Sequence, residues 1–226
     1  MKDISKKDYE KLIESAEVLE KDVHGDKVLL LPDSRICKIF RCKRTISSAK
    51  YYPYALRFKD NAEKLPTLGI TTVKVQDVYK AKHIERDLVL YELLEGETLR
   101  SVFEKTEEKK VLVEKLISYI SELHAKGVYF RSLHFGNVLV LPDGSLGLID
   151  ISDMKIAGKQ LGLLKRIRNF RAIFRYEQDK KVLLEYGLKN FLDRYISESE
   201  ISPGMFYTIL KMQKKHPAGI ILSQGG

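Results

Sequence analysis

The sequence predicts an α+β fold of two lobes, with a small strand-rich N-terminal lobe and a mainly helical C-terminal lobe. Short apolar runs separated by turn residues fill residues 1–94, whereas apolar residues at helical spacing dominate residues 95–215. Glu95-Gly96-Glu97-Thr98 interrupts both patterns, so we place the lobe boundary there. Residues 216–226 contain one Pro and three Gly and are expected to form a flexible tail.

The N-terminal lobe is predicted to contain two helices and two pairs of strands. Ser5 and Asp8 resemble a capping box, so a helix is expected to begin there. A Pro-Asp-Ser turn at residues 32–34 separates two apolar runs, which predicts a β-hairpin. The expected helices span residues 6–20 and 47–65, and the expected strands span residues 27–31, 35–40, 73–79 and 88–93.

The C-terminal lobe is predicted to consist mainly of helices. Its strongest pattern covers residues 107–125, where apolar residues recur at helical spacing and Gly127 follows as a stop signal. Basic residues interleaved with Ile and Phe predict an amphipathic helix with a basic face, for which simple contact with solvent is the alternative. These basic residues are Lys165, Arg166, Arg168, Arg171 and Arg175.

The charge balance of the chain indicates which classes of partner it favours. In 226 residues there are 40 Lys and Arg against 31 Asp and Glu, a formal net charge of +9 at pH 7. Such an excess favours anionic partners such as nucleic acid, lipid headgroups or phosphorylated substrates. A nucleic-acid-binding module is the minor alternative, because the sequence has no zinc-finger spacing and no RNA-binding aromatic signature. Without a long apolar run or a signal peptide, a cytoplasmic protein is expected, with association at the inner face of the cytoplasmic membrane as an option.

Two side chains with hard oxygen donors, Asn137 and Asp150, stand 13 residues apart around a predicted hairpin. Asn137 precedes the apolar run 138–140, and Asp150 directly follows Leu148-Ile149. Oxygen ligands of this kind suit Mg²⁺, so we interpret the pair as a metal site. The alternatives are a turn residue for Asn137 and a strand-end residue for Asp150.

Lys38 lies in the middle of the predicted strand Ile36-Cys37-Lys38-Ile39-Phe40. A lysine flanked by apolar residues is costly to bury unless its ammonium meets an anion, which favours a phosphate-binding role. An edge-strand lysine that points to water is the alternative.

These motifs together carry a family resemblance. The run Tyr129-Phe130-Arg131-Ser132-Leu133-His134, with Arg57-Phe58 and Asn61-Ala62, makes residues 25–185 similar to bacterial lipopolysaccharide kinases of the Kdo and heptose kinase type. The most similar branch is that of the toluene-tolerance proteins. The resemblance implies a protein-kinase-like fold with ATP and Mg²⁺ as cofactors. It also implies that the phosphoryl acceptor is a sugar hydroxyl of lipopolysaccharide, in the lipid A–core region.

The resemblance also assigns roles to single residues. Lys38 corresponds to the strand lysine that contacts the α- and β-phosphates, and Asn137 and Asp150 correspond to the metal ligands. The acidic partner of Lys38 is expected on the following helix, where we choose Glu63. The residues expected to line the adenine site are Tyr91 as gatekeeper, Glu92 through its carbonyl and Leu94 through its amide.

The sequence departs from its active relatives at the catalytic loop, which in them reads His-x-Asp-x-x-x-x-Asn. Phe130 and Ser132 stand at the His and Asp positions. A hydroxyl does not accept a proton as a carboxylate does, and loss of a general base typically costs about 10²–10⁴ in rate. His134 is an alternative base, with bracing of the loop as its other role. The glycine-rich loop also departs from the usual pattern, because Gly25 is the one glycine where kinases usually carry three. Two functions therefore stay open: a phosphotransferase, and a nucleotide-binding pseudokinase or scaffold in envelope homeostasis.

Overall fold

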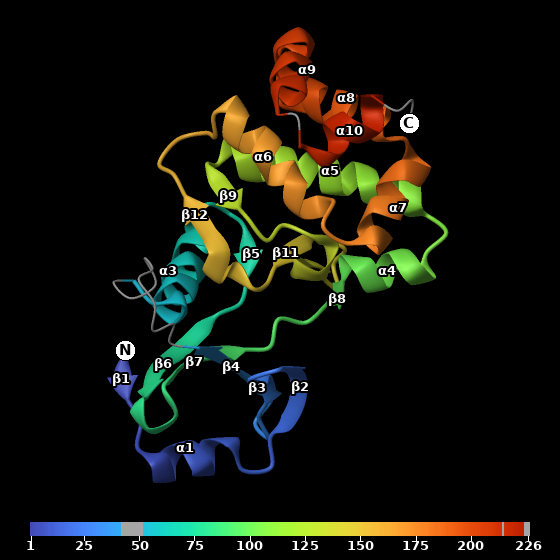
Figure 1. Ribbon diagram of the computed structural model, residues 1–226. Helices are drawn as coiled ribbons and strands as arrows, with labels where there is room; N and C mark the ends of the chain where they lie inside the picture. The colour runs from blue at the N-terminus through green and yellow to red at the C-terminus, as the bar shows by residue number, and fades with distance from the viewer. Residues whose placement is uncertain (42–51, 214, 224–226) are drawn as a thin grey trace. The chain divides into compact units, whose positions relative to one another are not determined.

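The computed structural model describes residues 1–41, 52–213 and 215–223 (Figure 1). The chain forms two compact units, Met1–Glu95 with Asp150–Asp153, and Gly96–Ile149 with Met154–Gly226. The first is rich in strands and the second in helices, which confirms the predicted α+β class. The division at Glu95 lies one residue from the predicted boundary, and Asp150–Asp153 join the first unit although they lie far along the chain.

The first unit is built on a six-stranded sheet in the order β1-β6-β7-β4-β3-β2, in which only β1 and β6 pair in parallel. Its strands are β1 (Lys2–Asp3), β2 (Glu17–Asp22), β3 (Gly25–Leu30), β4 (Arg35–Arg41), β6 (Val75–Ala81) and β7 (Arg86–Glu92). Side chains alternate between the two faces of a strand. Cys37 and Ile39 of β4 therefore join the core cluster beside helix α1 (Lys6–Ile13), while Lys38 and Phe40 share the opposite face.

Helix α1 begins as predicted but is shorter. The Ser5 hydroxyl accepts a hydrogen bond from the Asp8 amide at 3.1 Å, which is the predicted cap. The expected extension to residue 20 is wrong, because Ser15 takes a left-handed conformation, φ 62°, and the chain then enters β2. Helix α3 (Tyr54–Thr67) follows Pro53, and residues 47–51 of the helix predicted there lie outside the described ranges. The remaining elements of this unit are β5 (Thr71–Thr72), η1 (Lys82–Ile84) and η3 (Ile151–Asp153).

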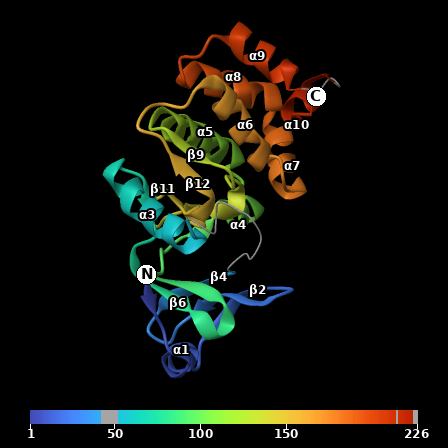
Figure 2. The same cartoon turned by 60° about the vertical axis from the view of Figure 1, so that its left-hand side comes forward.

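The second unit contains seven described helices and a core rich in aromatic side chains. In this core the Phe170 ring lies 4.7 Å from that of Tyr195 and 5.9 Å from that of Phe191, between ring centroids. Helix α5 lies beside α8, and α6 beside α9 (Figure 2). The helices are α4 (Leu99–Lys105), α5 (Lys109–Ala125), α6 (Leu163–Ile173), α7 (Glu177–Tyr186), α8 (Leu188–Glu198), α9 (Pro203–Met212) and α10 (Pro217–Ser223).

Short strands of the second unit frame the predicted catalytic loop. β10 (Val138–Val140) pairs antiparallel with β8 (Glu97–Thr98) and with β11 (Leu146–Leu148), which is the hairpin expected between Asn137 and Asp150. β9 (Val128–Phe130) pairs with β12 (Met154–Ile156), and η2 (Phe135–Asn137) lies between β9 and β10.

Residues 216–223 of the expected flexible tail are packed, and residues 224–226 lie outside the described ranges. His216 is fully buried, with Nε2 2.8 Å from the carbonyl of Ile167, and α10 buries Ala218. Composition misled here because Pro217 stands at a helix start, where proline is favourable. Among the described residues, no helix has the length and apolar character required to cross a membrane.

Candidate functional site

Lys38 and Asp150 form an ion pair within the first unit. The Nζ of Lys38 lies 2.8 Å from Oδ1 of Asp150, and the lysine side chain is 6% exposed. Lys38 stands on β4 opposite Val28 of β3 and Val89 of β7, so it lies on an interior strand and not at the edge of the sheet. The carboxylate offsets the cost of burying the ammonium. The anion expected next to Lys38 is therefore, in this structure, the residue predicted as a metal ligand.

Asp150 is held in a strained backbone conformation. Its φ of 52° lies in the left-handed region, which costs a non-glycine residue about 1–2 kcal/mol. The next residue is fixed by α3, because the Asn61 side-chain amide donates a 2.8 Å hydrogen bond to the carbonyl of Ile151. The Asp150 side chain is 34% exposed, so its carboxylate can also reach a cation. Strain of this kind persists only where the surroundings support it.

The partner chosen for Lys38, Glu63, is placed elsewhere. Glu63 pairs with Lys59 one turn earlier at 2.8 Å, and its side chain is 60% exposed. The buried face of α3 instead carries Phe58, Asn61 and Ala62. Residues at i, i+3 and i+4 share one helix face, which places Glu63 outside it. The apolar spacing of α3 was thus the signal that would have directed attention to Asn61.

The hinge residues continue β7. Tyr91 is 9% exposed, and burial raises its pKa above the ordinary value. Its ring centroid lies 5.3 Å from that of Phe58. The Glu92 amide donates to the carbonyl of Lys74 at 3.0 Å, and Leu94 is half-buried. Adenine contacts by Tyr91, Glu92 and Leu94 stay a prediction.

The β2–β3 hairpin stands where kinases carry their glycine-rich loop. Gly25 has φ 116°, a backbone conformation in which a residue with a side chain would be strained. The His24 amide donates a hydrogen bond to the Asp22 carboxylate at 2.7 Å. Val23 at the tip is 94% exposed. The Asp22 carboxylate occupies the His24 amide and adds negative charge at the turn, and both effects disfavour phosphate binding there.

Asn137 is oriented by the loop of the second unit that the sequence predicts to be catalytic. Its side-chain Nδ2 donates to the carbonyl of Ser132 at 2.9 Å, so Oδ1 is the atom left to act as a ligand. The backbone carbonyl of Asn137 accepts from the Ile149 amide at 3.1 Å. An amide oxygen from Asn137 and a carboxylate from Asp150 are the hard donors that Mg²⁺ prefers, so the residues present fit this ion. Asn137 belongs to the second unit and Asp150 to the first.

His134 packs as a brace within the loop. Its ring lies 4.7 Å from the Tyr176 ring, edge to face. A Cβ at Gly136 would lie 3.2 Å from His134 Nδ1 and 3.1 Å from Arg100, so any larger residue there would require these side chains to shift. Ser132 is half-buried. A catalytic role for Ser132 or His134 stays a prediction.

Phe130 is held by a buried polar network. The Asn169 side chain of α6 donates to the Phe130 carbonyl at 2.5 Å and accepts from the Phe130 amide at 3.3 Å. Nε2 of His124 donates to the same Asn169 oxygen at 3.2 Å, while the Tyr195 hydroxyl donates to Nδ1 at 2.7 Å. This pattern places the proton on Nε2 and keeps the imidazole neutral. Burial lowers the pKa of His124 to about 3.

The second unit is expected to lose stability on mild acidification. Burial lowers the pKa of His124 to about 3 and of His216 to about 4, against an ordinary value of 6.5. Below pH 6.5 the unfolded chain therefore binds protons that the folded chain does not, whereas above it neither state does. Each histidine should lower the free energy of unfolding by up to about 1.4 kcal/mol per pH unit between these limits. Urea unfolding followed by circular dichroism measures this, and a stability that stays flat from neutral pH to about 5 would contradict it.

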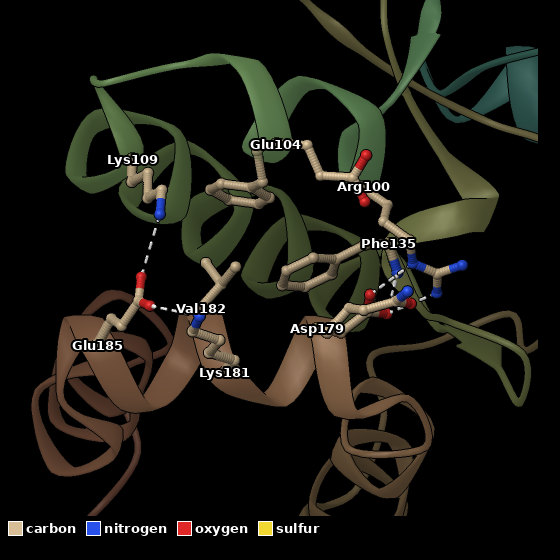
Figure 3. A pocket seen from close by; sticks show the side chains of 10 residues that line it. Arg100, Glu104, Lys109, Phe135, Asp179, Lys181, Val182 and Glu185 are labelled. Atoms are coloured by element: carbon tan, nitrogen blue, oxygen red, sulfur yellow. Dashed lines mark hydrogen bonds and ion pairs between the residues drawn. The ribbon is translucent and has the colours of Figure 1, made fainter.

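Arg100 of α4 and Asp179 of α7 hold the loop at a second point, and we call this pair the clamp. The Phe135 amide donates to Oδ2 of Asp179 at 3.0 Å, and Asp179 is fully buried. Arg100 binds both carboxylate oxygens, Nε to Oδ1 at 2.7 Å and Nη2 to Oδ2 at 3.0 Å, and its guanidinium lies 4.5 Å above the Tyr176 ring. The clamp forms one end of a cavity of about 280 Å³ between the two helices (Figure 3).

Neither member of the clamp was predicted from the sequence. Asp179 stands in Glu177-Gln178-Asp179-Lys180-Lys181, a run of polar residues that predicts a solvent-exposed helix face. Arg100 lies just past the hinge without a motif of its own. Only the three-dimensional packing of α4, η2 and α7 brings the pair together.

The comparisons with known proteins identify the fold. No protein-family model and no curated protein matches the sequence. Among solved structures, the chain is similar to a divergent kinase that lacks the glycine-rich loop and regulates membrane ultrastructure of the Toxoplasma parasitophorous vacuole. The match has a TM-score of 0.52 and 17% identity, and covers 97% of this chain and 87% of that one.

This likeness confirms the predicted protein-kinase-like fold. At 17% identity it concerns the fold alone. It supports the fold that the sequence resemblance implied, whereas the lipopolysaccharide kinase branch stays a prediction.

Proposed function

We propose that this protein binds ATP with Mg²⁺ through Lys38, Asn137 and Asp150. The observation that carries the proposal is the buried Lys38 paired with Asp150 at 2.8 Å on a kinase-like fold. In this proposal Lys38 binds phosphate oxygens, and Asp150 and Asn137 hold the ion by their oxygens. A bound Mg²⁺ would neutralise charge on the phosphates.

The acceptor step depends on Ser132. A carboxylate at this position would orient an attacking hydroxyl and take its proton, which a serine cannot do at neutral pH. Phosphoryl transfer relies mainly on positioning and charge, so the braced loop around Phe130 and Phe135 favours a reduced activity. We propose a sugar hydroxyl of an envelope glycolipid as the acceptor, on the sequence resemblance only. A nucleotide-binding pseudokinase is the second candidate, favoured by Phe130 and Ser132 at the two catalytic positions.

Replacing Ser132 with Asp is expected to raise phosphoryl transfer. A carboxylate restores the missing base, which is typically worth about 10²–10⁴ in rate. The measurement is transfer of labelled γ-phosphate from ATP to lipopolysaccharide core acceptors. Ser132→Ala is the matched control and should not exceed the wild type. A protein that binds ATP but transfers no phosphate with either Ser or Asp at this position would be a pseudokinase.

A further inference from the structure

A long acid-free stretch surrounds α6. Between Asp153 and Glu177, residues 154–176 include seven Lys or Arg and no Asp or Glu. In a chain where charged residues of both signs are otherwise interspersed, this segregation concentrates positive charge on one helix, drawn in orange in Figure 1. Clusters of this kind attract anionic surfaces.

The exposed side of α6 is a line of arginines headed by a leucine. The helix buries Arg166, Ile167, Asn169, Phe170 and Ile173. At about 100° per residue, Leu164, Arg168 and Arg171 fall within about 60° of one another on the opposite side, and Arg175 follows after the helix end. We name these four residues the arginine face.

The basic face expected from sequence is corrected in one residue. Arg166 is 5% exposed and donates to the carbonyl of Leu161 at 2.8 Å, so it serves the interior. The arginines at 168, 171 and 175 are exposed. Leu164 is 55% exposed, a large apolar side chain placed in line with them.

The arginine face is not neutralised by the protein itself. Many surface cations of this unit have acidic partners: Lys180 pairs with Glu177, Lys189 with Asp193 and Arg194 with Glu114. Within the part of the chain that the structure describes, no acidic side chain forms an ion pair with Arg168, Arg171 or Arg175. Their guanidinium groups therefore keep their capacity to bind external phosphates.

We propose that the arginine face docks this protein onto an anionic lipid bilayer. The arginines would bind headgroup phosphates, and Leu164 would enter the boundary between headgroups and acyl chains. A nucleic acid fits less well, because an exposed leucine in the line has no role there. In addition, α6 is packed against the unit along its other side and presents a shallow strip rather than an element that enters a groove. The proposal does not depend on nucleotide binding.

The test is sedimentation of the full chain with vesicles of phosphatidylcholine alone or mixed with phosphatidylglycerol in equal amounts. Wild type is expected to bind only the mixed vesicles, less tightly as salt increases. Each basic residue near an anionic surface strengthens binding about fivefold, so Arg168→Gln/Arg171→Gln/Arg175→Gln should weaken it about 100-fold. Leu164→Ser should weaken binding while leaving its salt dependence unchanged.

The matched control removes the same charge from the first unit. Lys7, Lys11 and Lys80 are exposed, so Lys7→Gln/Lys11→Gln/Lys80→Gln should keep nearly all vesicle binding. Equal loss in both triple variants would overturn the proposal, because net charge alone would then explain binding. The proposal would also fail if wild type ignored the mixed vesicles, or if the arginine variant lost binding to RNA but not to vesicles. Matching thermal unfolding of all variants shows that each is folded.

Discussion

Replacing Asp179 with Ala is expected to lower the free energy of unfolding of the helical unit by about 1.5–3 kcal/mol, because it leaves Arg100 and the Phe135 amide without their shared acceptor. Asp179 is fully buried and receives three hydrogen bonds, two from Arg100 and one from Phe135. The same change removes a contact that holds the segment ending at Asn137. We therefore expect the predicted metal ligand Asn137 to become less well ordered.

Urea unfolding of the Asp179→Ala and Glu185→Ala variants measures the effect against a control. Glu185 lines the other end of the same cavity and pairs with Lys109 at 3.2 Å, but both side chains are more than 40% exposed. An exposed pair typically contributes about 0–1 kcal/mol, so this variant should remain close to wild type. Equal and small effects in the two variants would mean that the clamp does not stabilise the loop.

Replacing Lys38 with Met is expected to weaken binding of ATP·Mg about 10–100-fold. A hydrogen bond to a charged group is worth about 1.5–3 kcal/mol, which is the interaction that the proposed phosphate contact would lose. Methionine has a similar length and is compatible with burial, and Asp150 is 34% exposed and can be hydrated once the ammonium is gone. The fold should therefore survive, and calorimetric titration with ATP and Mg²⁺ measures the loss.

Glu63→Ala distinguishes the observed partner of Lys38 from the one chosen from sequence. Glu63 is exposed and pairs with Lys59, so its removal should change the affinity for ATP·Mg less than about twofold. An effect as large as that of Lys38→Met would show that Glu63 serves the nucleotide after all. The position of Asn61 against Ile151 would then describe only the protein without nucleotide.

The sequence was informative where one local pattern decides the outcome. The Ser5 cap, the hairpin around residues 32–34 and the long helix α5 each follow from local signals, and all three are present. The helix expected through residue 20 ended early because Glu17–Asp22 form a hairpin with β3, and this strand pairing outweighs the helical pattern of the same residues. Tertiary context overrides propensity in such segments.

Site residues were harder to predict when burial reverses their usual role. Asn61 and Asp179 are polar residues on helices, where such residues usually face water. Both are buried and hold backbone groups, the carbonyl of Ile151 and the amide of Phe135. Arg166 was assigned to the basic face although it points inward. In each case the role of the residue depends on which face of its helix packs against the rest of the unit. Helices whose polar and apolar residues are intermixed do not reveal that face in their sequence.

Calorimetric titration of the wild-type protein and of Asp150→Ala with ATP and Mg²⁺ tests the central claim most directly. The account predicts binding by the wild type that requires Mg²⁺ and disappears in the variant, since Asp150 pairs with Lys38 and is proposed to supply a ligand oxygen to the ion. Both proteins should be folded, which a single cooperative unfolding transition under the same conditions would show. Absence of binding by the wild type at millimolar ATP, or binding that Asp150→Ala leaves intact, would contradict it.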